Sequence, residues 1–199
     1  MMPNRIMMFR PHLNDMPSFE ITEPYAIRWH RDGDDRHWMA IKSASDTEHR
    51  APPGFYERVY GAHVYALAQR QAFLCDGTGE PVGTVTAWWF ENLRDSTLGK
   101  VNWMLIVPRA QGHGLSKPLL TTCLTRLALL GHTRAALYTL TSRVPAINLY
   151  RSFGFVPLIR HADDLRSWAA TNSHLKRPYA ESEYLRTSDL GINAEALAG

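Results

Sequence analysis

The sequence has 199 residues, of which 45% are hydrophobic and 21% are charged. A chain of this length predicts one main core, large enough to fold without disulfides or a structural metal. The composition excludes wholesale disorder, a collagen-like repeat and a coiled coil. The formal net charge is +3 and the basic residues are scattered, so we expect no nucleic-acid partner. A small positive excess does suit a phosphorylated ligand.

The two cysteines, Cys75 and Cys123, stand in apolar stretches and form no metal-binding pair. We expect both to be buried free thiols. The start of the chain lacks the apolar run of a secretory signal, and no stretch approaches the roughly 20 apolar residues of a membrane span. These features predict a cytoplasmic protein without a membrane partner.

The chain divides into three expected parts. Residues 1–23 hold three prolines and little periodicity, which predicts an irregular N-terminal arm. Residues 24–160 carry the pattern of an α/β domain. Residues 161–199 predict a helix over 163–170 and then a polar tail from residue 180 with few core candidates. A homodimer is compatible with this organisation, because the arm and the tail could cover the surface of a partner.

The first half of the main domain predicts strands and helices in mixed order. The expected elements are a strand over 25–29, a helix over 37–43 with aspartate N-caps, one helix within 55–71, and a hairpin of strands 72–75 and 82–89. Histidines and aspartates gather between residues 30 and 37, but they lack the order of a calcium loop. We therefore assign no metal site.

The second half alternates strands and helices. Residues 100–107 form an almost continuous apolar run, typical of a strand inside a sheet. Leucines and other apolar residues recur every three or four positions over 115–130, and Gly131 follows, which predicts an amphipathic helix with a glycine end. The remaining expected elements are a strand over 135–140, a helix over 145–153 and a strand over 155–159.

The junction between strand 100–107 and helix 115–130 is the most informative feature. Gly112 and Gly114 stand immediately before the helix. Glycines let the backbone approach a ligand, and the first amides of a helix have no intrahelical acceptor. Such an end binds pyrophosphate well. Taken alone the glycine pair is weak evidence, because tight turns also use glycine for geometry.

Two motifs occur in order along the chain. Residues 107–116 resemble motif A of the Gcn5-related N-acetyltransferase (GNAT) superfamily, with Val-x-Pro, Gln-x-x-Gly and a following helix. Ser116 stands where the family usually has Gly or Ala. Residues 146–155 resemble motif B, with Leu-Tyr on a helix and Gly-Phe entering the next strand. The resemblance covers about residues 72–159, and it departs at Arg143, where many members have Asn near the cofactor.

The resemblance implies an α/β (α+β) fold with a mixed, mostly antiparallel central sheet flanked by helices and splayed at the acetyl-CoA site. It implies acetyl-CoA as the donor and no metal. The strand residues offer backbone groups to the pantetheine arm while the loop amides hold the pyrophosphate. Plain core packing is the alternative role for the strand side chains. The expected cofactor-binding residues are Leu105, Ile106, Val107, Gln111, Gly112, His113, Gly114, Leu115, Ser116 and Asn148.

Two residues are expected to move protons. Tyr150 matches the family position of the acid that protonates the leaving thiolate, and a core tyrosine is the alternative. No carboxylate lies in residues 101–107, so Glu91 is the expected base, acting through water; an exposed loop residue is the alternative. Arg151 is either a phosphate ligand or part of a solvated helix face.

These residues predict an acetyl-CoA-dependent N-acetyltransferase that moves acetyl to a primary amine of a small molecule or peptide by direct attack. Proximity and orientation supply most of the rate in such a transfer. The alternative is a non-catalytic acyl-CoA-binding regulatory module, which the missing strand carboxylate favours and Tyr150 opposes. Aromatic residues 88–90 and Trp103 line either an acceptor pocket or the core.

Overall fold

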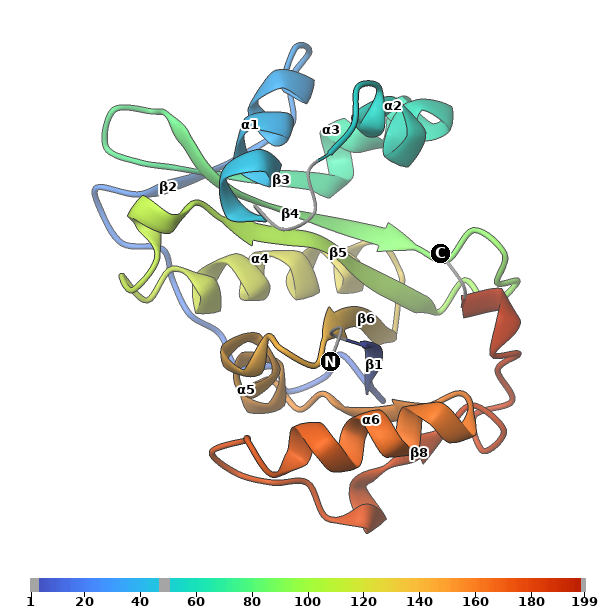
Figure 1. The fold of residues 1–199 in the computed structure, drawn as a ribbon. Helices are drawn as coiled ribbons and strands as arrows, with labels where there is room; N and C mark the ends of the chain where they lie inside the picture. Colours follow the sequence, from blue (N-terminus) through green and yellow to red (C-terminus); the bar gives the residue numbers. More distant parts are fainter. Residues whose placement is uncertain (1–3, 47–50, 198–199) are drawn as a thin grey trace. The chain divides into compact units, whose positions relative to one another are not determined.

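The computed structural model describes residues 4–46 and 51–197 (Figure 1). Its helices are α1 (Asp35–Ser45), α2 (Phe55–Tyr60), α3 (Leu67–Arg70), α4 (Ser116–Leu129), α5 (Val144–Ser152) and α6 (Ala162–Asn172). Its strands are β1 (Arg5–Arg10), β2 (Ala26–Trp29), β3 (Gln71–Cys75), β4 (Pro81–Trp89), β5 (Leu98–Ile106), β6 (Arg134–Leu140), β7 (Val156–Ile159) and β8 (Leu185–Arg186). Short 3-10 turns are η1 (Gly61–Ala66), η2 (Pro108–Ala110), η3 (Glu181–Glu183) and η4 (Glu195–Leu197).

The strands form one eight-stranded sheet in the order β2-β3-β4-β5-β6-β1-β7-β8. Strand β3 is antiparallel to β2 and β4, and β1 is antiparallel to β6 and β7. Parallel pairing joins β5 to β6 and β7 to β8. The prediction of a mixed, mostly antiparallel sheet flanked by helices is confirmed.

The chain folds into two compact units, which we describe separately. Unit 1 comprises residues 1–17, 88–101 and 127–199, and unit 2 comprises residues 18–87 and 102–126. These boundaries run through β4, β5 and α4. The division of the chain into an arm, a main domain and a tail stays a prediction.

Strand β1 lies inside the sheet of unit 1, between β6 and β7. Met7 pairs with Tyr138 on one side and with Leu158 on the other, and the side chains from Ile6 to Phe9 are fully buried. The expectation of an irregular segment is therefore wrong for Arg5–Arg10. A strand buried on both faces shows no polar alternation, so its short apolar run carries no periodic signal.

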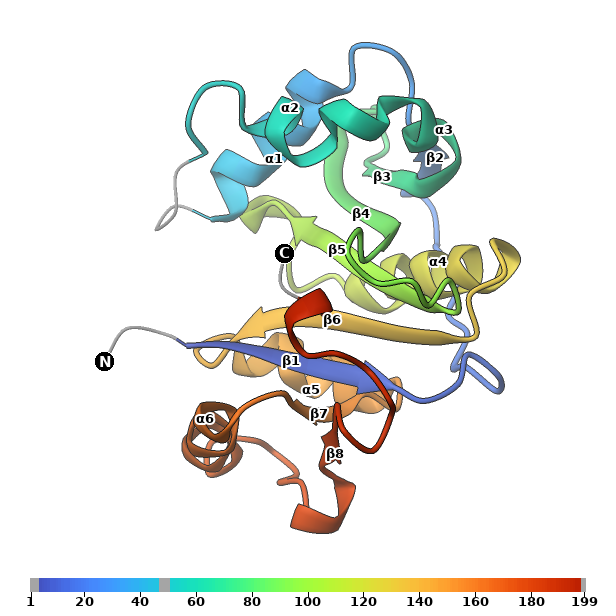
Figure 2. The same cartoon turned by 90° about the vertical axis from the view of Figure 1, so that its right-hand side faces the viewer.

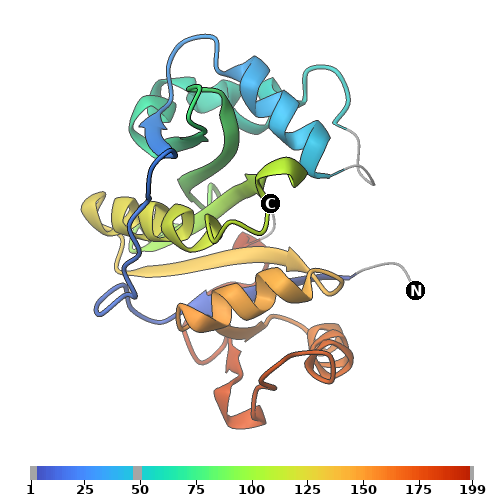
Figure 3. The ribbon, with the colours of Figure 1, turned by 90° about the vertical axis from the view of Figure 1, so that its left-hand side faces the viewer.

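The end of the chain packs against the same part of the sheet. Figures 2 and 3 show α5 on one face of β6 and β1, and the segment after β8 on the opposite face. Ile192 and Leu197 are buried there with Met7 and Phe9 of β1 and Leu158 of β7. The expectation that the tail contributes little to the core is therefore wrong. A few spaced apolar side chains are enough to cover this sheet face.

In unit 2 the predicted hairpin of β3 and β4 is confirmed, and β2 pairs with β3. The single helix expected within 55–71 is wrong, because α2 gives way to η1 and then α3, with a non-helical backbone at His63. Asp34 does precede α1, but its carboxylate accepts from Arg28 and from the Arg31 amide and does not cap the helix. The charge-assisted hydrogen bonds from Arg28 are stronger than a hydrogen bond to a helix-end amide, so the carboxylate pairs with the arginine.

The core of unit 2 is aromatic. The Trp38 ring of α1 lies 5.4 Å from the Tyr56 ring, 5.7 Å from the Tyr60 ring and 5.4 Å from the Trp103 ring, mostly edge to face. Such pairs add stability beyond the area that they bury. They anchor α1 and α2 to β5.

Both cysteines are buried free thiols, as expected. Burial raises the pKa of Cys75 and of Cys123. Within the part of the chain that the structure describes, no helix is both long and apolar enough to cross a membrane. The same residues contain no group of three or more His, Cys, Asp or Glu side chains suited to a metal ion.

Candidate active site

The end of β5 is tied to the loop that follows it in unit 2. The Val107 amide donates to the Val82 carbonyl of β4 at 2.9 Å, and η2 begins at the next residue. The Gln111 side-chain amide then turns back and donates to the Ile106 carbonyl at 2.8 Å. Leu105 and Val107 are buried, so these side chains pack in the core while the backbone leads into the loop.

Gly112 and Gly114 hold the loop in a conformation that other residues rarely adopt. Their φ angles are +80° and +77°, in the left-handed region. A Cβ atom placed on either residue would meet nothing within 4 Å. The glycines are therefore needed for the backbone conformation, and the space beside their Cα atoms is open.

The loop delivers the chain to the first turn of α4. Leu119 already donates its amide to the Leu115 carbonyl at 3.2 Å, and Pro118 has no N–H. The helix-end amides that remain for another acceptor are those of Leu115, Ser116 and Lys117. These amides carry the positive end of the helix dipole.

Charged and aromatic side chains surround this loop. Lys117 is exposed, with its ammonium 4.8 Å from the Phe19 ring centroid, and the His113 ring lies 6.3 Å from that of Tyr25. Arg109 pairs with Asp76 at 3.0 Å in the β3–β4 turn. Hydrogen bonds from Thr78 and Arg109 lower the pKa of Asp76 to about 2. Lys117 is thus the solvent-facing cation on the first turn of α4.

Strand β5 is irregular just before the loop. Trp103 has a φ of +48°, which is rare for a bulky residue and marks a local break in the strand. Its ring is held edge to face between Trp38 and Phe55, at 5.4 and 5.6 Å. Packing of the large ring compensates the backbone strain and fixes the position where β5 changes course.

Two predicted site residues lie on α5 in unit 1. Tyr150 is 7% exposed, and its ring meets that of Phe155 at 6.0 Å. The Asn148 side-chain amide donates to the Val144 carbonyl of its own helix at 3.0 Å. Pro145 at the start of α5 and Gly154 after its end set the limits of the helix, as the sequence predicts.

Arg151 on the same helix does not lie on a solvated face. Its guanidinium pairs with Glu183 at 3.2 Å and lies 3.7 Å from the Tyr179 ring centroid. The expectation of a solvated helix face is wrong at this position. The partners come from the segment after α6, which the sequence pattern could not associate with α5.

Glu91 lies in the loop after β4 and is exposed. It faces Lys100 of β5, whose pKa is lowered to about 8 by burial and by the charge of Arg5, against an opposing effect of Glu91. Sequence reasoning missed Lys100 as a functional candidate. A lysine at the start of a buried apolar strand is the signal that could have identified it.

The structure brings the predicted residues into separate groups. Residues 105–107 and 111–116 lie in unit 2 on either side of η2, in the stretch that joins β5 to α4. Tyr150 and Asn148 share α5 in unit 1. Glu91 is also in unit 1, exposed in the loop after β4.

Residues 13–155 match the family model described as the acetyltransferase (GNAT) family. The chain belongs to this family. The GNAT chain is also 29% identical over 161 residues to the mycothiol acetyltransferase of Streptomyces coelicolor, covering 76% of this chain and 48% of that protein. It therefore spans about half the length of this curated relative.

Solved structures show the same GNAT fold. A GCN5-related N-acetyltransferase from Sphaerobacter thermophilus matches with a TM-score of 0.63 and 19% identity, over 78% of this chain and 48% of that chain. A spermidine N-acetyltransferase from Vibrio cholerae, solved with CoA and spermine, matches with a TM-score of 0.54 and 20% identity, over 68% of this chain and 82% of that chain. At these identities the likeness concerns the fold alone.

Proposed function

We propose that the protein is an N-acetyltransferase that uses acetyl-CoA as donor and a primary amine as acceptor. The observation that carries the proposal is the loop of Gly112 and Gly114, with left-handed glycines opening onto the first turn of α4. Backbone amides at a helix N-terminus behind such glycines suit a pyrophosphate. Membership of the GNAT family supports the acetyl donor.

The donor side rests on backbone groups. The amides of 115–117 and the Lys117 ammonium supply positive charge for the diphosphate, and the backbone of 105–107 borders the extended arm. The Gln111 side chain is engaged with Ile106, so its contribution is to fix the loop. His113 and Ser116 contribute loop backbone, and Leu115 both packs in the core and accepts the first helical bond.

Bound acetyl-CoA supplies an activated acyl group, and the protein moves two protons around its transfer. In the transfer the neutral amine would form a C–N bond as the C–S bond breaks. Tyr150 would donate its hydroxyl proton to the departing sulfur and regain the proton that the acylated nitrogen must lose, and Asn148 on the same helix would help to hold the donor. Glu91 removes the amine proton through water, because an amine is mostly protonated at neutral pH.

The name of one similar protein supports an amine acceptor. The structure from Vibrio cholerae is named a spermidine N-acetyltransferase, and the relative from Streptomyces coelicolor is named a mycothiol acetyltransferase, which supports acetyl as the transferred group. The acceptor class proposed for this chain is accordingly a small molecule or peptide that bears a primary amine.

Donor binding is tested by calorimetric titration of acetyl-CoA, with ATP as a comparator. We expect saturable binding of acetyl-CoA near micromolar affinity, about −8 kcal/mol, and a much weaker response to ATP. Gly114→Ala should weaken binding of acetyl-CoA at least about tenfold, because the left-handed backbone is strained by a Cβ.

Gly79→Ala is the matched control for this substitution. Gly79 has a φ of +84° and, like Gly114, open space around a hypothetical Cβ, but it lies in the β3–β4 turn. Both substitutions should therefore cost similar stability, and only Gly114→Ala should weaken binding. Equal affinities in the two variants, or no heat up to millimolar donor, would contradict the donor site.

Catalysis is tested by thiol release across a panel of amines. Tyr150→Phe should lower kcat at least about tenfold at unchanged donor affinity, because only the hydroxyl proton is removed. Tyr65→Phe is the control, since Tyr65 is 76% exposed. If the parent protein binds acetyl-CoA but acetylates no amine in the panel, the regulatory-module alternative gains and the enzymatic assignment fails.

A further inference from the structure

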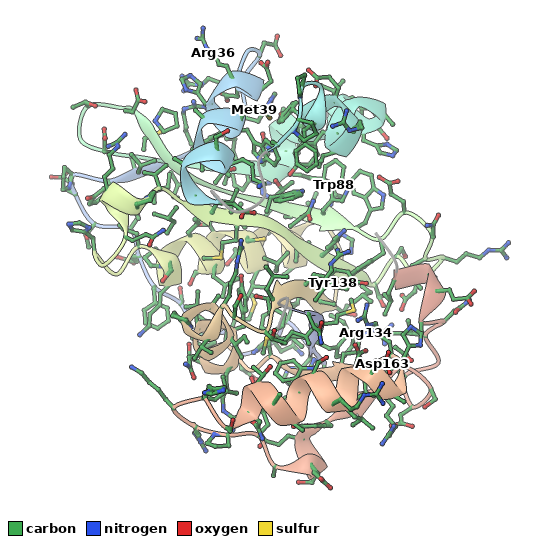
Figure 4. All side chains as sticks on the ribbon, viewed as in Figure 1. Arg36, Met39, Trp88, Arg134, Tyr138 and Asp163 are labelled. Carbon is green, nitrogen blue, oxygen red and sulfur yellow. The ribbon has the colours of Figure 1, made fainter. Side chains whose placement is uncertain are left out.

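Three cationic side chains converge on one aromatic ring in unit 1. Tyr138 projects from β6 (Figure 4), and its ring centroid lies 3.7 Å from the Arg5 guanidinium carbon, 5.3 Å from that of Arg160 and 6.0 Å from the Lys100 ammonium. The cations come from β1, from the end of β7 and from β5. Residues far apart in the chain thus build one positive cluster.

The acidic side chains nearby do not balance these charges. Arg160 is held by both carboxylate oxygens of Asp164, at 2.8 and 2.9 Å. Across residues 4–46 and 51–197, neither the Arg5 guanidinium nor the Lys100 ammonium forms a hydrogen bond or an ion pair. Glu91 acts on Lys100 only through its more distant charge. Two cations of the cluster therefore lack a direct anionic partner.

The remaining interactions leave these two charges poorly compensated. Burial lowers the pKa of Arg5 and of Lys100 most, and the repulsion of a neighbouring cation adds to it in each case, against opposing effects of Tyr138 on Arg5 and of Glu91 on Lys100. The Tyr138 ring attracts cations, but this attraction is worth only about 0.5–2 kcal/mol. Its hydroxyl is already engaged, since it donates to the Leu197 carbonyl and accepts from Arg160. This hydroxyl oxygen therefore does not serve Arg5 or Lys100 as a hydrogen-bond acceptor.

The cluster is accessible and has the donors that an anion requires. Although its guanidinium is partly desolvated against Tyr138, Arg5 as a whole residue is exposed, and Lys100 is half-buried, so a small solute can reach both. A guanidinium offers a planar fork to carboxylate or phosphate oxygens, and an ammonium adds a point charge. We propose that Arg5 and Lys100, backed by Arg160, form a binding site for a small ligand that carries a phosphate or carboxylate group. This site is separate in sequence from the glycine loop and does not depend on the proposed acetyl transfer.

The test uses the full chain with inorganic phosphate and with citrate, each compared with chloride at equal ionic strength. Thermal unfolding should show saturable stabilisation of the parent protein by at least one of the two anions, and their relative strength identifies the preferred group. Lys100→Met should raise the half-saturating anion concentration at least about tenfold, because it removes the ammonium. Lys176→Met, at an exposed lysine of the same unit, should leave that concentration unchanged.

Further variants separate this site from a folding effect and from the glycine loop. Without anion, Lys100→Met should unfold at a higher temperature than the parent. If the lysine instead stabilised the fold, Lys100→Met would unfold at a lower temperature. Lys100→Arg should retain anion-dependent stabilisation, and Arg5→Gln should lose most of it. Gly114→Ala should keep it. Stabilisation that is equal in the parent and Lys100→Met, or that Gly114→Ala abolishes, would overturn the proposal.

Discussion

Removing the Leu197 side chain tests whether the end of the chain is part of the core. Leu197 is fully buried in η4 and packs in the cluster that contains Met7 and Phe9 of β1. Its carbonyl also accepts the hydroxyl of Tyr138, which holds the turn in place. Truncating a fully buried leucine costs about 2–5 kcal/mol. We expect Leu197→Ala to lower the free energy of unfolding by about 2–4 kcal/mol, since a short 3-10 turn can shift to fill part of the cavity.

The assay is equilibrium unfolding in urea, followed by fluorescence and circular dichroism. Leu129→Ala is the control, because Leu129 is 73% exposed at the end of α4. That substitution should change the stability by no more than about 0.5 kcal/mol. A loss for Leu197→Ala as small as that for Leu129→Ala would refute the assignment of the C-terminal segment to the core.

Two further predictions concern unit 1. Gly154→Ala should lower the free energy of unfolding, measured in urea, by about 3 kcal/mol or more, because φ is +77° and the new Cβ would collide with the buried Arg10 guanidinium. The control Gly191→Ala, with φ +63° and open space around the Cβ, should cost about 1–2 kcal/mol. Equal losses in the two variants would show that the Arg10 side chain can move aside at no cost. Lys100 has a pKa of about 8 when folded against an ordinary value of 10.5, so the unfolded state binds more protons between these values and stability rises with pH. At low salt without anion, the parent should therefore be less stable than Lys100→Met by about 1–2 kcal/mol at pH 7, and the gap should narrow between pH 8 and 10; a constant gap would exclude titration of this ammonium.

Local features of the sequence predicted the elements that carry the GNAT motifs. Helix α4 covers Ser116–Leu129, close to the expected 115–130, because apolar residues repeat along one face and Gly131 has a φ of +87° at its end. The left-handed backbone of Gly112 and Gly114 is also a local property. The motif alone therefore predicts that glycine is required at positions 112 and 114.

Features that depend on distant partners were not predictable in this way. Strand β1 is defined by its pairing with β6, more than a hundred residues later, and not by a pattern of its own. The lowered pKa of Lys100 arises first from burial in the folded protein and then from the charge of Arg5, which is distant in the sequence. Arg151 reads as a surface residue of α5 until Glu183 and Tyr179 are brought beside it. In each case the fold topology determines which residues become neighbours. The periodicity of a single helix or strand carries no information about that topology.

The core of unit 1 extends beyond the region that carries the family resemblance. The family match covers residues 13–155, whereas β1, β7 and β8 lie outside it. Without β1, the edge of β6 would present unpaired backbone groups, and an unpaired edge invites association with another strand. Without the C-terminal segment, the side chains of Phe90 and Leu98 would lose the buried partners Ile192 and Leu197. The matched region therefore specifies the glycine loop and α5, while the two flanking segments complete the sheet and the hydrophobic cluster on which unit 1 depends.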